Sequence, residues 1–485
     1  MKKINKKVSG IFLFLHLNFF LFAQSEYSAL SKLLTGFLEE DLQLKKYVLE
    51  AKTSELDNSS TKIQTGINFS LSTGNVSVKL SDDSNSISVS PEVNLNIPSF
   101  ANSKIELKLP LEIEKSETYV KNGNLSYSFD IFSSSTKERQ IELLESERAL
   151  ILSKRNVKKR ALSAEKEFYE ILQKLFNYAV TIYEKKSDYY DDSLALKVLQ
   201  TQGYSTTSAK YRQAYLKVQS DEREIKEKIR ILVRETANFA FKCGVEFNSE
   251  STFEEVLAFL PDKIPLSKSE NILDYKKEKY SKIESELYNQ KLASLKREAK
   301  KDLTLSATAL YKFNSDTSNS DDAGGNFLIN YKGIDFSSGM FFPTNNSIFK
   351  NSSSASASSS PYFQFSFGFD PIQWKLDKIE KEQDKIDEES EKVSLKIAEE
   401  DYDSTVLSKI SLLNDIEWSR KANEEELSLY TQLEKDMKIW LSEGIVTESD
   451  YIDSLNNKRK SEINVILNKI ENAIFNGEIK ILFVE

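Results

Sequence analysis

The stretch YFQFSFGFDPIQWKLDKIEKEQDKI, residues 362–386, decides the fold because it joins two different periodicities through one proline. Before Pro371 every second residue is a phenylalanine, and after it apolar residues recur every seven positions, at Ile379, Ile386 and Val393. A period of two is typical of a strand, and a period of seven is typical of a helix that packs against another helix. Pro371 fits a strand end or the first turn of a helix. The sequence therefore predicts a strand that passes directly into a long helix.

The alternation sends one set of side chains to each face of this strand. Gln364, Ser366 and Gly368 lie on one face, and the other face carries Phe363, Phe365, Phe367 and Phe369. A row of exposed phenylalanines requires a solvent other than water, so these four are candidate lipid-facing residues. Tyr362 and Trp374 are candidates for an aromatic belt at a membrane interface, although Trp374 is equally compatible with packing inside a helix layer.

The same junction occurs about 240 residues earlier, in NLSYSFDIFSSSTKERQIELLESERALI, residues 124–151. Four apolar residues alternate there, namely Leu125, Tyr127, Phe129 and Ile131. Serine and threonine residues follow as candidate helix caps, and a charged helix starts near Lys137. Two copies of one strand-to-helix junction predict that the chain contains two internal structural repeats.

The first 23 residues have the features of a signal peptide. A lysine-rich start precedes an apolar run over residues 11–22, and Ala23 is a plausible cleavage point. The run is too short for a comfortable transmembrane helix, and no later segment is long and apolar enough to span a bilayer as a helix. Loss of residues 1–23 removes four lysines and no acids, which changes the formal charge from -9 to -13. A chain this acidic is an unlikely partner for nucleic acid.

The repeats divide the remaining chain in the following order. Residues 24–245 form the first repeat, with a helix, strands within 62–131, a long helix, a turn at Gly203 and a second helix. Residues 246–269 are a linker. Residues 270–485 form the second repeat, with a helix, strands within 303–370, a long helix, a turn at Gly444 and a last helix. Each strand region is longer than two membrane strands require, so extra hairpins or large loops are expected.

The composition argues against an enzyme. His16 is the only histidine and lies in the predicted signal peptide, and Cys243 is the only cysteine. A mature chain with one cysteine and no histidine has no internal disulfide, no histidine-based triad and none of the usual zinc sites. We therefore predict no catalytic, cofactor-binding or metal-binding residues, and we interpret Cys243 as a small buried side chain near a helix end.

Together these features resemble the TolC-like outer-membrane efflux protein family, also called outer membrane factors, over essentially the whole mature chain. The order of helix, strands, long helix, glycine turn and helix, written twice, is the organisation of that family. Two junction stretches support it, as does EGIVTESDYIDSLNN, residues 443–457. This last stretch matches the family pattern G-x-x-T-x-x-D-x-x-D with Gly444, Thr447, Asp450 and Asp453.

The resemblance implies an α+β membrane protein that assembles as a homotrimer in the outer membrane. Its strands contribute to one trimeric transmembrane β-barrel in contact with outer-membrane lipid, and its long helical hairpins form a periplasmic α-barrel that contains most of the chain. The implied function is a passive exit duct of a tripartite efflux or type I secretion system. Its implied partners are a periplasmic adaptor, or membrane fusion protein, and an inner-membrane transporter. The alternative is a periplasmic or surface coiled-coil structural protein without transport activity.

The resemblance also assigns candidate site residues. The turns that would dock the adaptor contain Gly203, Ser205, Thr207, Gly444 and Thr447. Where relatives with a charged closing latch carry Asp and Arg, this chain has Ala209 and Val446, so that latch is not expected here.

Asp450 and Asp453 are candidate pore-constriction residues. They lie three positions apart on one face of the last helix, and threefold symmetry would repeat them as rings of carboxylates that favour cations. The alternative is helix capping, with Thr447 as the N-cap and Asp450 three positions later. Both interpretations can hold at once for Asp450.

Overall fold

The computed structural model describes residues 28–80, 85–114, 117–132, 135–300, 303–313, 321–344 and 360–484. The predicted signal peptide, residues 1–23, lies outside the described residues. The chain divides into two compact units, each built from segments of both halves of the sequence. Unit 1 contains Met1–Val48, Arg155–Ser281 and Glu399–Glu485, and unit 2 contains Leu49–Lys154 and Lys282–Ala398.

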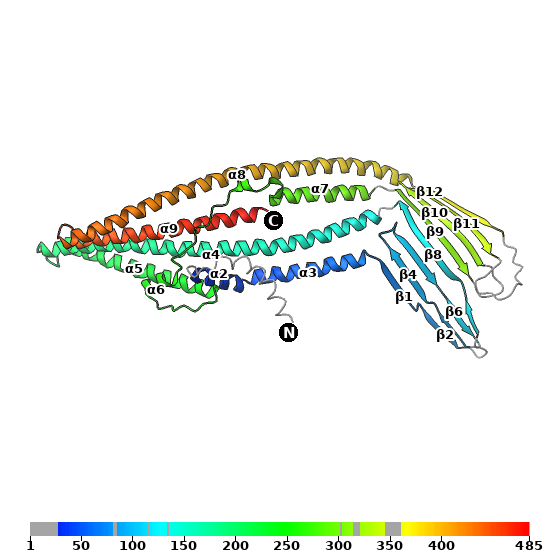
Figure 1. Ribbon diagram of the computed structural model, residues 1–485, viewed down its shortest axis with the longest axis horizontal. Helices are drawn as coiled ribbons and strands as arrows, with labels where there is room; N and C mark the ends of the chain where they lie inside the picture. Colours follow the sequence, from blue (N-terminus) through cyan, green and yellow to red (C-terminus); the bar gives the residue numbers. More distant parts are fainter. Residues whose placement is uncertain are drawn as a thin grey trace. The chain divides into compact units, whose positions relative to one another are not determined.

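Several helices are long, and the two longest end just before the turns at Gly203 and Gly444 (Figure 1). In chain order the helices are α2 (Ser28–Glu40), α3 (Leu42–Gln64), α4 (Ser135–Thr201), α5 (Ala209–Lys242), α6 (Phe253–Phe259), two 3-10 turns η3 (Ile272–Asp274) and η4 (Lys277–Lys279), α7 (Ser281–Ala299), α8 (Pro371–Ser442) and α9 (Glu448–Leu482). The predicted passage from strand to helix is confirmed, because β12 (Tyr362–Phe369) is followed after one residue by α8. The carboxylate of Asp370 accepts hydrogen bonds from the amides of Ile372 and Gln373 and so caps α8.

All strands belong to unit 2. The strands are β1 (Asn68–Ser72), β2 (Val76–Leu80), β3 (Asn85–Val89), β4 (Glu92–Ile97), β5 (Ser103–Lys108), β6 (Leu111–Glu114), β7 (Glu117–Val120), β8 (Gly123–Phe132), β9 (Leu303–Phe313), β10 (Asp321–Tyr331), β11 (Ile334–Thr344) and β12. An antiparallel eight-stranded sheet has the order β1-β4-β5-β8-β9-β10-β11-β12, with β1 and β12 as its two edges. A second, four-stranded sheet has the order β2-β3-β6-β7. The expectation of extra hairpins is confirmed.

Each strand of the four-stranded sheet is joined through a short break to a strand of the larger sheet: β2 to β1, β3 to β4, β6 to β5, and β7 to β8. Each first-repeat strand breaks once, and the breaks are adjacent: the Leu109 amide donates to the Pro91 carbonyl, and the Lys121 amide donates to the Pro110 carbonyl, both at 2.9 Å. At Gly74 the backbone has φ 61°, and a Cβ added there would lie 2.0 Å from the Ser90 carbonyl oxygen. Only glycine fits such an approach. The two proline positions cannot donate ladder hydrogen bonds, which explains why the strands end there.

In unit 2 segments of four helices lie side by side, in the same order as the strands to which they connect. Lys62 of α3 pairs with Glu147 of α4 at 3.2 Å, and Lys300, which follows α7, pairs with Glu380 of α8 at 2.8 Å. Between them, Arg148 of α4 makes a two-pronged pair with Glu284 of α7. The order is therefore α3, α4, α7, α8, with α3 leading into one edge strand of the sheet and α8 leaving the other (Figure 1).

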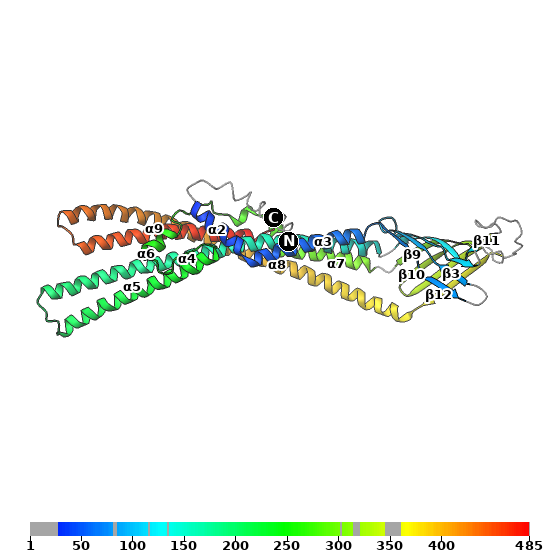
Figure 2. The same ribbon diagram turned by 90° about the horizontal axis from the view of Figure 1, so that it is seen from below.

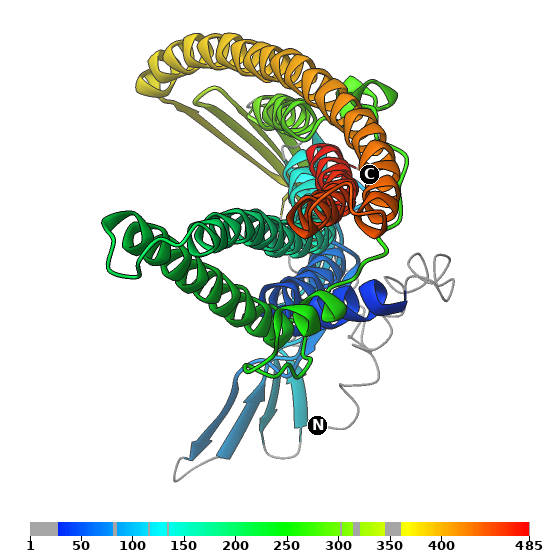
Figure 3. The ribbon, with the colours of Figure 1, turned by 90° about the vertical axis from the view of Figure 1, so that its left-hand side faces the viewer.

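Unit 1 contains the hydrophobic core and both helical hairpins. Phe168 of α4 is fully buried, with its ring 5.7 Å from Phe37 and 5.4 Å from Phe239. One stripe of α4 is buried, and it comprises Leu172, Leu175, Phe176, Ala179 and Tyr183. Figures 2 and 3 show α4 with α5, and α8 with α9, as two separate antiparallel pairs joined by their turns.

Several predicted boundaries were wrong for local reasons. The first helix, expected as one piece, is broken at Asp41, whose carboxylate accepts the amides of Gln43 and Leu44 and starts a new helix. Strands expected from residue 62 begin at Asn68, because α3 continues to Gln64. A helix expected from residue 270 begins only at Ser281, after η3 and η4. Within the described residues, no helix combines the length and the hydropathy needed to cross a membrane.

Candidate functional site

One face of the eight-stranded sheet is mostly apolar, and its polar exceptions are Ser103, Ser338 and the opposite pair Asp321 and Thr344. In an antiparallel ladder, directly opposite residues share a face, so the register carries the phenylalanine face of β12 across every neighbour. The apolar face comprises, from β12 to β1, Phe363, Phe365, Phe367 and Phe369; Ile334, Phe336, Met340 and Phe342; Phe327, Ile329 and Tyr331; Leu305, Ala307, Ala309 and Tyr311; Leu125, Tyr127 and Phe129; Ile105 and Leu107; Val93, Leu95 and Ile97; Phe69 and Leu71. We call this the apolar face.

The four candidate lipid-facing phenylalanines lie on the apolar face and are exposed. Phe367 is 72% exposed and Phe365 is 66% exposed, whereas Phe168 in unit 1 is fully buried. Fully exposing such side chains to water costs about 1.5 to 3 kcal/mol each relative to burial. A sheet with this many exposed aromatic and aliphatic side chains must therefore be covered in its functional state.

The opposite face of the same sheet is polar. It carries Ser366, Gln364, Ser337, Asp335, Asn326, Asn330, Thr304, Thr308, Ser126, Ser128, Asn94 and Asn96. Glu106 on this face lies between Lys104 and Lys108, at 3.0 and 2.6 Å. The exceptions are Leu310, Leu328 and a Phe341–Tyr362 pair whose rings stack at 5.0 Å.

The four-stranded sheet has the same two-faced character. Its apolar side carries Val76, Val78, Leu80, Ile87, Val89, Leu111, Ile113 and Val120, and charged residues such as Lys79 and Glu112 lie on the other side. In a continuous strand, residues on one face all have odd numbers or all have even numbers. The apolar residues of β3 and β4 all have odd numbers, so their break does not change the alternation. Between β1 and β2 the apolar residues change from odd to even numbers, and the change occurs at Gly74. A single additional residue at the positive-φ glycine thus keeps the apolar side chains on one face.

Two aromatic residues lie at the two ends of β12 in the eight-stranded sheet, Trp374 near its junction with α8 and Tyr362 at its far end. Trp374, in the first turn of α8, is 57% exposed, so it does not pack inside the helix layer of its own chain. Tyr362, the first residue of β12, is exposed and stacks on Phe341, but the register places it on the polar face with Gln364 and Ser366. Tyr362 therefore does not fit a belt on the apolar face, and the aromatic belt remains a prediction for Trp374 only.

The candidate docking turns have matching backbone geometry. Gly203 and Gly444 have φ values of 78° and 72°, and no atom lies within 4 Å of a Cβ added to either. The amide of the next residue reaches back five positions in both turns, from Tyr204 to Leu199 and from Ile445 to Trp440. This is a helix stop that uses the left-handed region open to glycine, so both glycines are required for conformation and not for packing.

The helix that follows each turn is capped by a hydroxyl. Thr447 caps α9 as predicted, and Ser208 caps α5. Ser205 and Thr207 bond to each other, at 2.7 Å, and so lie in the turn itself. Both remain exposed.

The two pore-constriction candidates differ in their surroundings. Asp450 forms a capping box with Thr447: its carboxylate accepts the Thr447 amide at 2.9 Å, and its own amide donates to the threonine hydroxyl at 3.2 Å. Bonds from the Thr447 hydroxyl and amide lower the pKa of Asp450 below its usual value. Asp453 is half-buried and accepts a bond from the Asn457 amide group at 3.3 Å. The capping interpretation of Asp450 is confirmed, and the carboxylate rings remain a prediction.

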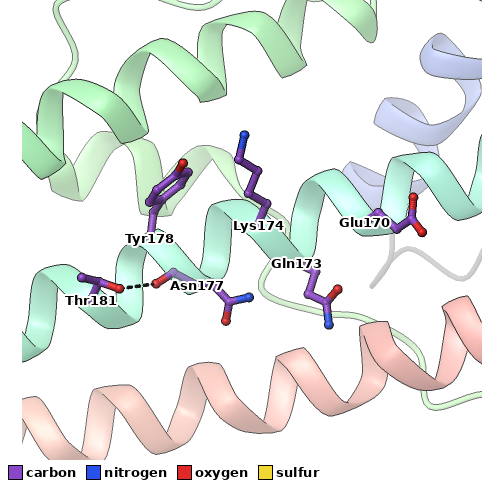
Figure 4. A pocket seen from close by; sticks show the side chains of 6 residues that line it. All are labelled: Glu170, Gln173, Lys174, Asn177, Tyr178 and Thr181. Atoms are coloured by element: carbon purple, nitrogen blue, oxygen red, sulfur yellow. Dashed lines mark hydrogen bonds between the residues drawn. The ribbon is translucent and has the colours of Figure 1, made fainter.

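A polar pocket of about 360 Å³ lies along α4 (Figure 4). It is lined by Glu170, Gln173, Lys174, Asn177, Tyr178 and Thr181. Lys174 pairs with Glu235 at 3.0 Å, and the Thr181 hydroxyl donates to the Asn177 carbonyl. One helix supplies all six residues, so this is a groove beside α4 and not a convergent set of catalytic groups. In the part of the chain that the structure describes, no group of His, Cys, Asp or Glu side chains is arranged to hold a metal ion.

A set of buried asparagines on α9 was missed in the sequence. Asn472 donates to the Ser267 carbonyl at 2.7 Å, and Asn476 accepts the Glu270 amide at 2.7 Å. Asn468, one turn earlier, donates to Ser419. Asparagine at every fourth position of a helix marks one face, and that spacing was the available signal. Asn472 and Asn476 thus hold the end of the linker between the repeats on α9, and Asn468 joins α9 to α8.

In both halves strands run directly into a long helix closed by a glycine turn, which is the order of elements that the resemblance to TolC-like proteins implies. Residues 33–264 match the family model described as the TP096X N-terminal domain, and residues 265–485 match the TP096X C-terminal domain. The two matches together span residues 33–485, and the chain belongs to the TP096X family.

Three solved structures are among those to which the chain is similar. The chain is similar to the open-state MtrE outer membrane channel of Neisseria gonorrhoeae, with 11% identity, 92% of this chain and 88% of that chain covered, and a TM-score of 0.43. It is also similar to the CmeC outer membrane channel of Campylobacter jejuni, with 12% identity, 94% of this chain and 84% of that chain covered, and a TM-score of 0.41. A third is the outer membrane protein VceC of Vibrio cholerae, with 11% identity, 93% of this chain and 95% of that chain covered, and a TM-score of 0.39. No curated protein matches the chain.

Proposed function

We propose that this protein is an outer-membrane exit duct that passively conducts substrates from the periplasm to the exterior. The observation that carries the proposal is the apolar face, which crosses all eight strands while the other face is polar. In a transmembrane sheet, such a pair of faces meets lipid on one side and a water-filled lumen on the other. The protein acts by conduction and not as an enzyme.

The two edges of the eight-stranded sheet support assembly from several copies. Because the sheet is antiparallel throughout and has an even number of strands, β12 of one copy can pair antiparallel with β1 of the next. If Phe69 lies opposite Phe365 or Phe367, the apolar face is continuous across that junction. A shift of the β1–β12 register by one residue would place apolar residues opposite polar ones. A homotrimer, as the resemblance implies, would close a barrel of 24 strands from three sheets of eight.

The helical hairpins would then form the periplasmic tunnel, with most of the chain in the periplasm. The turns around Gly203 and Gly444, together with the exposed Ser205, Thr207 and Thr447, are the candidate contacts for a periplasmic adaptor that is docked to an inner-membrane transporter. A passive duct has no energy source of its own, so the transporter would supply the work and select the cargo. Tripartite efflux and type I secretion both use this arrangement.

The second candidate function is a periplasmic or surface coiled-coil structural protein. The long helices favour it, but it gives no role to an exposed face of phenylalanines. Cell fractionation distinguishes the two. A duct remains with outer membranes through a carbonate wash, needs detergent for extraction, and gives a three-subunit band after cross-linking. Release by carbonate, or a monomer only, would overturn the duct.

A further inference from the structure

Two helices of unit 2 carry exposed apolar stripes with the same spacing. On α3, Leu49, Leu56 and Ile63 recur every seven residues, and each is more than half exposed. On α8 the stripe comprises Ile372, Ile379, Ile386 and Val393, again every seven residues and each more than half exposed. Seven residues advance about 10.5 Å along a helix, so the two stripes have equal steps.

The stripes face away from the contacts that each helix makes in its own unit. On α3, Asn58 is buried and accepts a bond from Ser146 of α4, whereas Leu56 is 71% exposed. On α8, Glu391 is half-buried and pairs with Arg297 of α7, whereas Ile386 is 66% exposed. The described contacts run from α3 to α4, from α4 to α7 and from α7 to α8, which leaves the two stripes on the outer helices of the layer.

We infer that the stripe of α3 in one copy packs against the stripe of α8 in the next copy as an antiparallel coiled coil. The inference rests on the proposed function, in which β12 of one copy pairs with β1 of the next. That pairing brings α8 of the first copy beside α3 of the second. The inference commits to a second copy of this chain as the occupant. The pairs, counted outward from the sheet, are Ile63 with Ile372, Leu56 with Ile379, and Leu49 with Ile386.

The register of the pairs follows from the strands. Ile63 lies five residues before β1, and Ile372 lies three residues after β12, so the first apolar step on each helix is close to its edge strand. Helix α3 runs toward the sheet and α8 runs away from it, which makes the pairing antiparallel. A strict seven-residue repeat keeps such a seam facing its partner through a left-handed supercoil.

Charges beside the seam are complementary in this register. Lys52 follows Leu49 by three positions, and Glu382 follows Ile379 by three, so both lie between the second and third pairs. Among the residues that the structure describes, neither side chain has an ion-pair partner. Opposite charges flanking an apolar seam select the partner and the orientation.

Cysteine cross-linking in isolated outer membranes tests the register. In a Cys243→Ala background, which removes the native thiol, the pair Leu56→Cys and Ile379→Cys should form covalent links between chains on oxidation. The matched control combines Leu56→Cys with Lys385→Cys, since residue 385 is exposed on another face of α8, and it should link at least tenfold less. Coexpression of the two single variants with different tags should give a mixed-tag product, which shows that the link joins two copies.

The outcomes separate this inference from the proposed function. A three-subunit band with lysine-reactive cross-linker, but no link through residues 56 and 379, overturns the coiled coil and leaves the duct intact. Links from these cysteines to another protein, such as an adaptor, also overturn it. Absence of any oligomer in the membrane overturns the proposed function itself.

Charge reversal gives a second, independent measurement. Lys52→Glu and Glu382→Lys should each lower the temperature at which the oligomer dissociates in mild detergent, and the double variant should recover most of the loss. A double variant no better than the worse single variant would show that the two residues do not face each other.

Discussion

Phe336 of β11 and Phe367 of β12 lie directly opposite each other in the antiparallel register, and both side chains are exposed. The next opposite pair, Ser337 and Ser366, lies on the other face, where the two hydroxyls are 2.7 Å apart. One residue along the strand thus separates a wholly apolar pair from a hydrogen-bonded polar pair. The contrast provides matched positions for testing which face meets lipid.

Phe367→Lys should block assembly in the outer membrane, because a lysine near the middle of a bilayer costs about 2 to 4 kcal/mol on the lipid face of a barrel. Ser366→Lys should be tolerated if that face lines a wet lumen. The measurement is the yield of cross-linked trimer in washed outer membranes. Equal loss for both variants would indicate a buried soluble sheet.

Thr447→Ala should destabilise the start of α9 by about 1 kcal/mol, because it removes half of the capping box. Interactions with Thr447 lower the pKa of Asp450, so its contribution is present above the ordinary aspartate pKa of about 3.9 and is lost as the pH falls through the lower folded-state value. Thermal unfolding followed from pH 7 to pH 3 should show an acid loss in the native chain that is smaller in Asp450→Asn. An identical pH profile in the two proteins would exclude this contribution.

Asp453→Asn should weaken block by divalent cations while leaving trimer yield nearly unchanged, if both aspartates line the narrow end of the tunnel. Its bond to Asn457 is the lesser of the local contacts, at 3.3 Å. Asp450→Asn should weaken the block too, with some loss of stability. Single-channel currents in planar bilayers measure this, and a block insensitive to both substitutions would assign Asp450 to capping only.

Gly444→Ala should cost about 1 to 2 kcal/mol, since the positive φ there is strained for a residue with a Cβ even though space is available. Gly444→Asn should cost less, because asparagine tolerates the left-handed region. The same order is expected at Gly203. Unfolding temperatures of the three proteins in detergent provide the comparison, and equal losses for Ala and Asn would point to a steric role.

Asn476→Ala should release the linker between the repeats. The substitution removes an acceptor from the Glu270 amide and a donor to the Lys268 carbonyl, at 2.7 and 3.0 Å, at a cost of about 1 to 3 kcal/mol. Hydrogen exchange at the Glu270 amide should accelerate. Asn457→Ala, at a half-buried position far from the linker, is the control, and it should leave that amide unchanged.

Local patterns in the sequence predicted the elements whose signal is continuous. The alternating phenylalanines and the heptad of α8 were sufficient for β12 and its helix, glycine was sufficient for both turns, and Thr447 was sufficient for the cap of α9. The strands between residues 68 and 132 are rich in Ser and Asn, so their number and the row of breaks depend on pairing partners that lie far apart in the chain. The burial of Asn472 and Asn476 on α9 was missed, because it depends on the folded linker that packs on them.

The edges of the eight-stranded sheet affect the protein before it reaches its final state. A single copy presents unpaired backbone groups along β1 and β12 beside a broad surface of phenylalanine, valine and leucine, and this combination promotes aggregation. Folding of one copy in water would therefore compete with precipitation. If the copies assemble as proposed, they must meet lipid and one another within a short interval, or be held unfolded by a chaperone until then. Dilution from denaturant into buffer should precipitate the chain, whereas dilution into detergent micelles or lipid should give soluble assemblies.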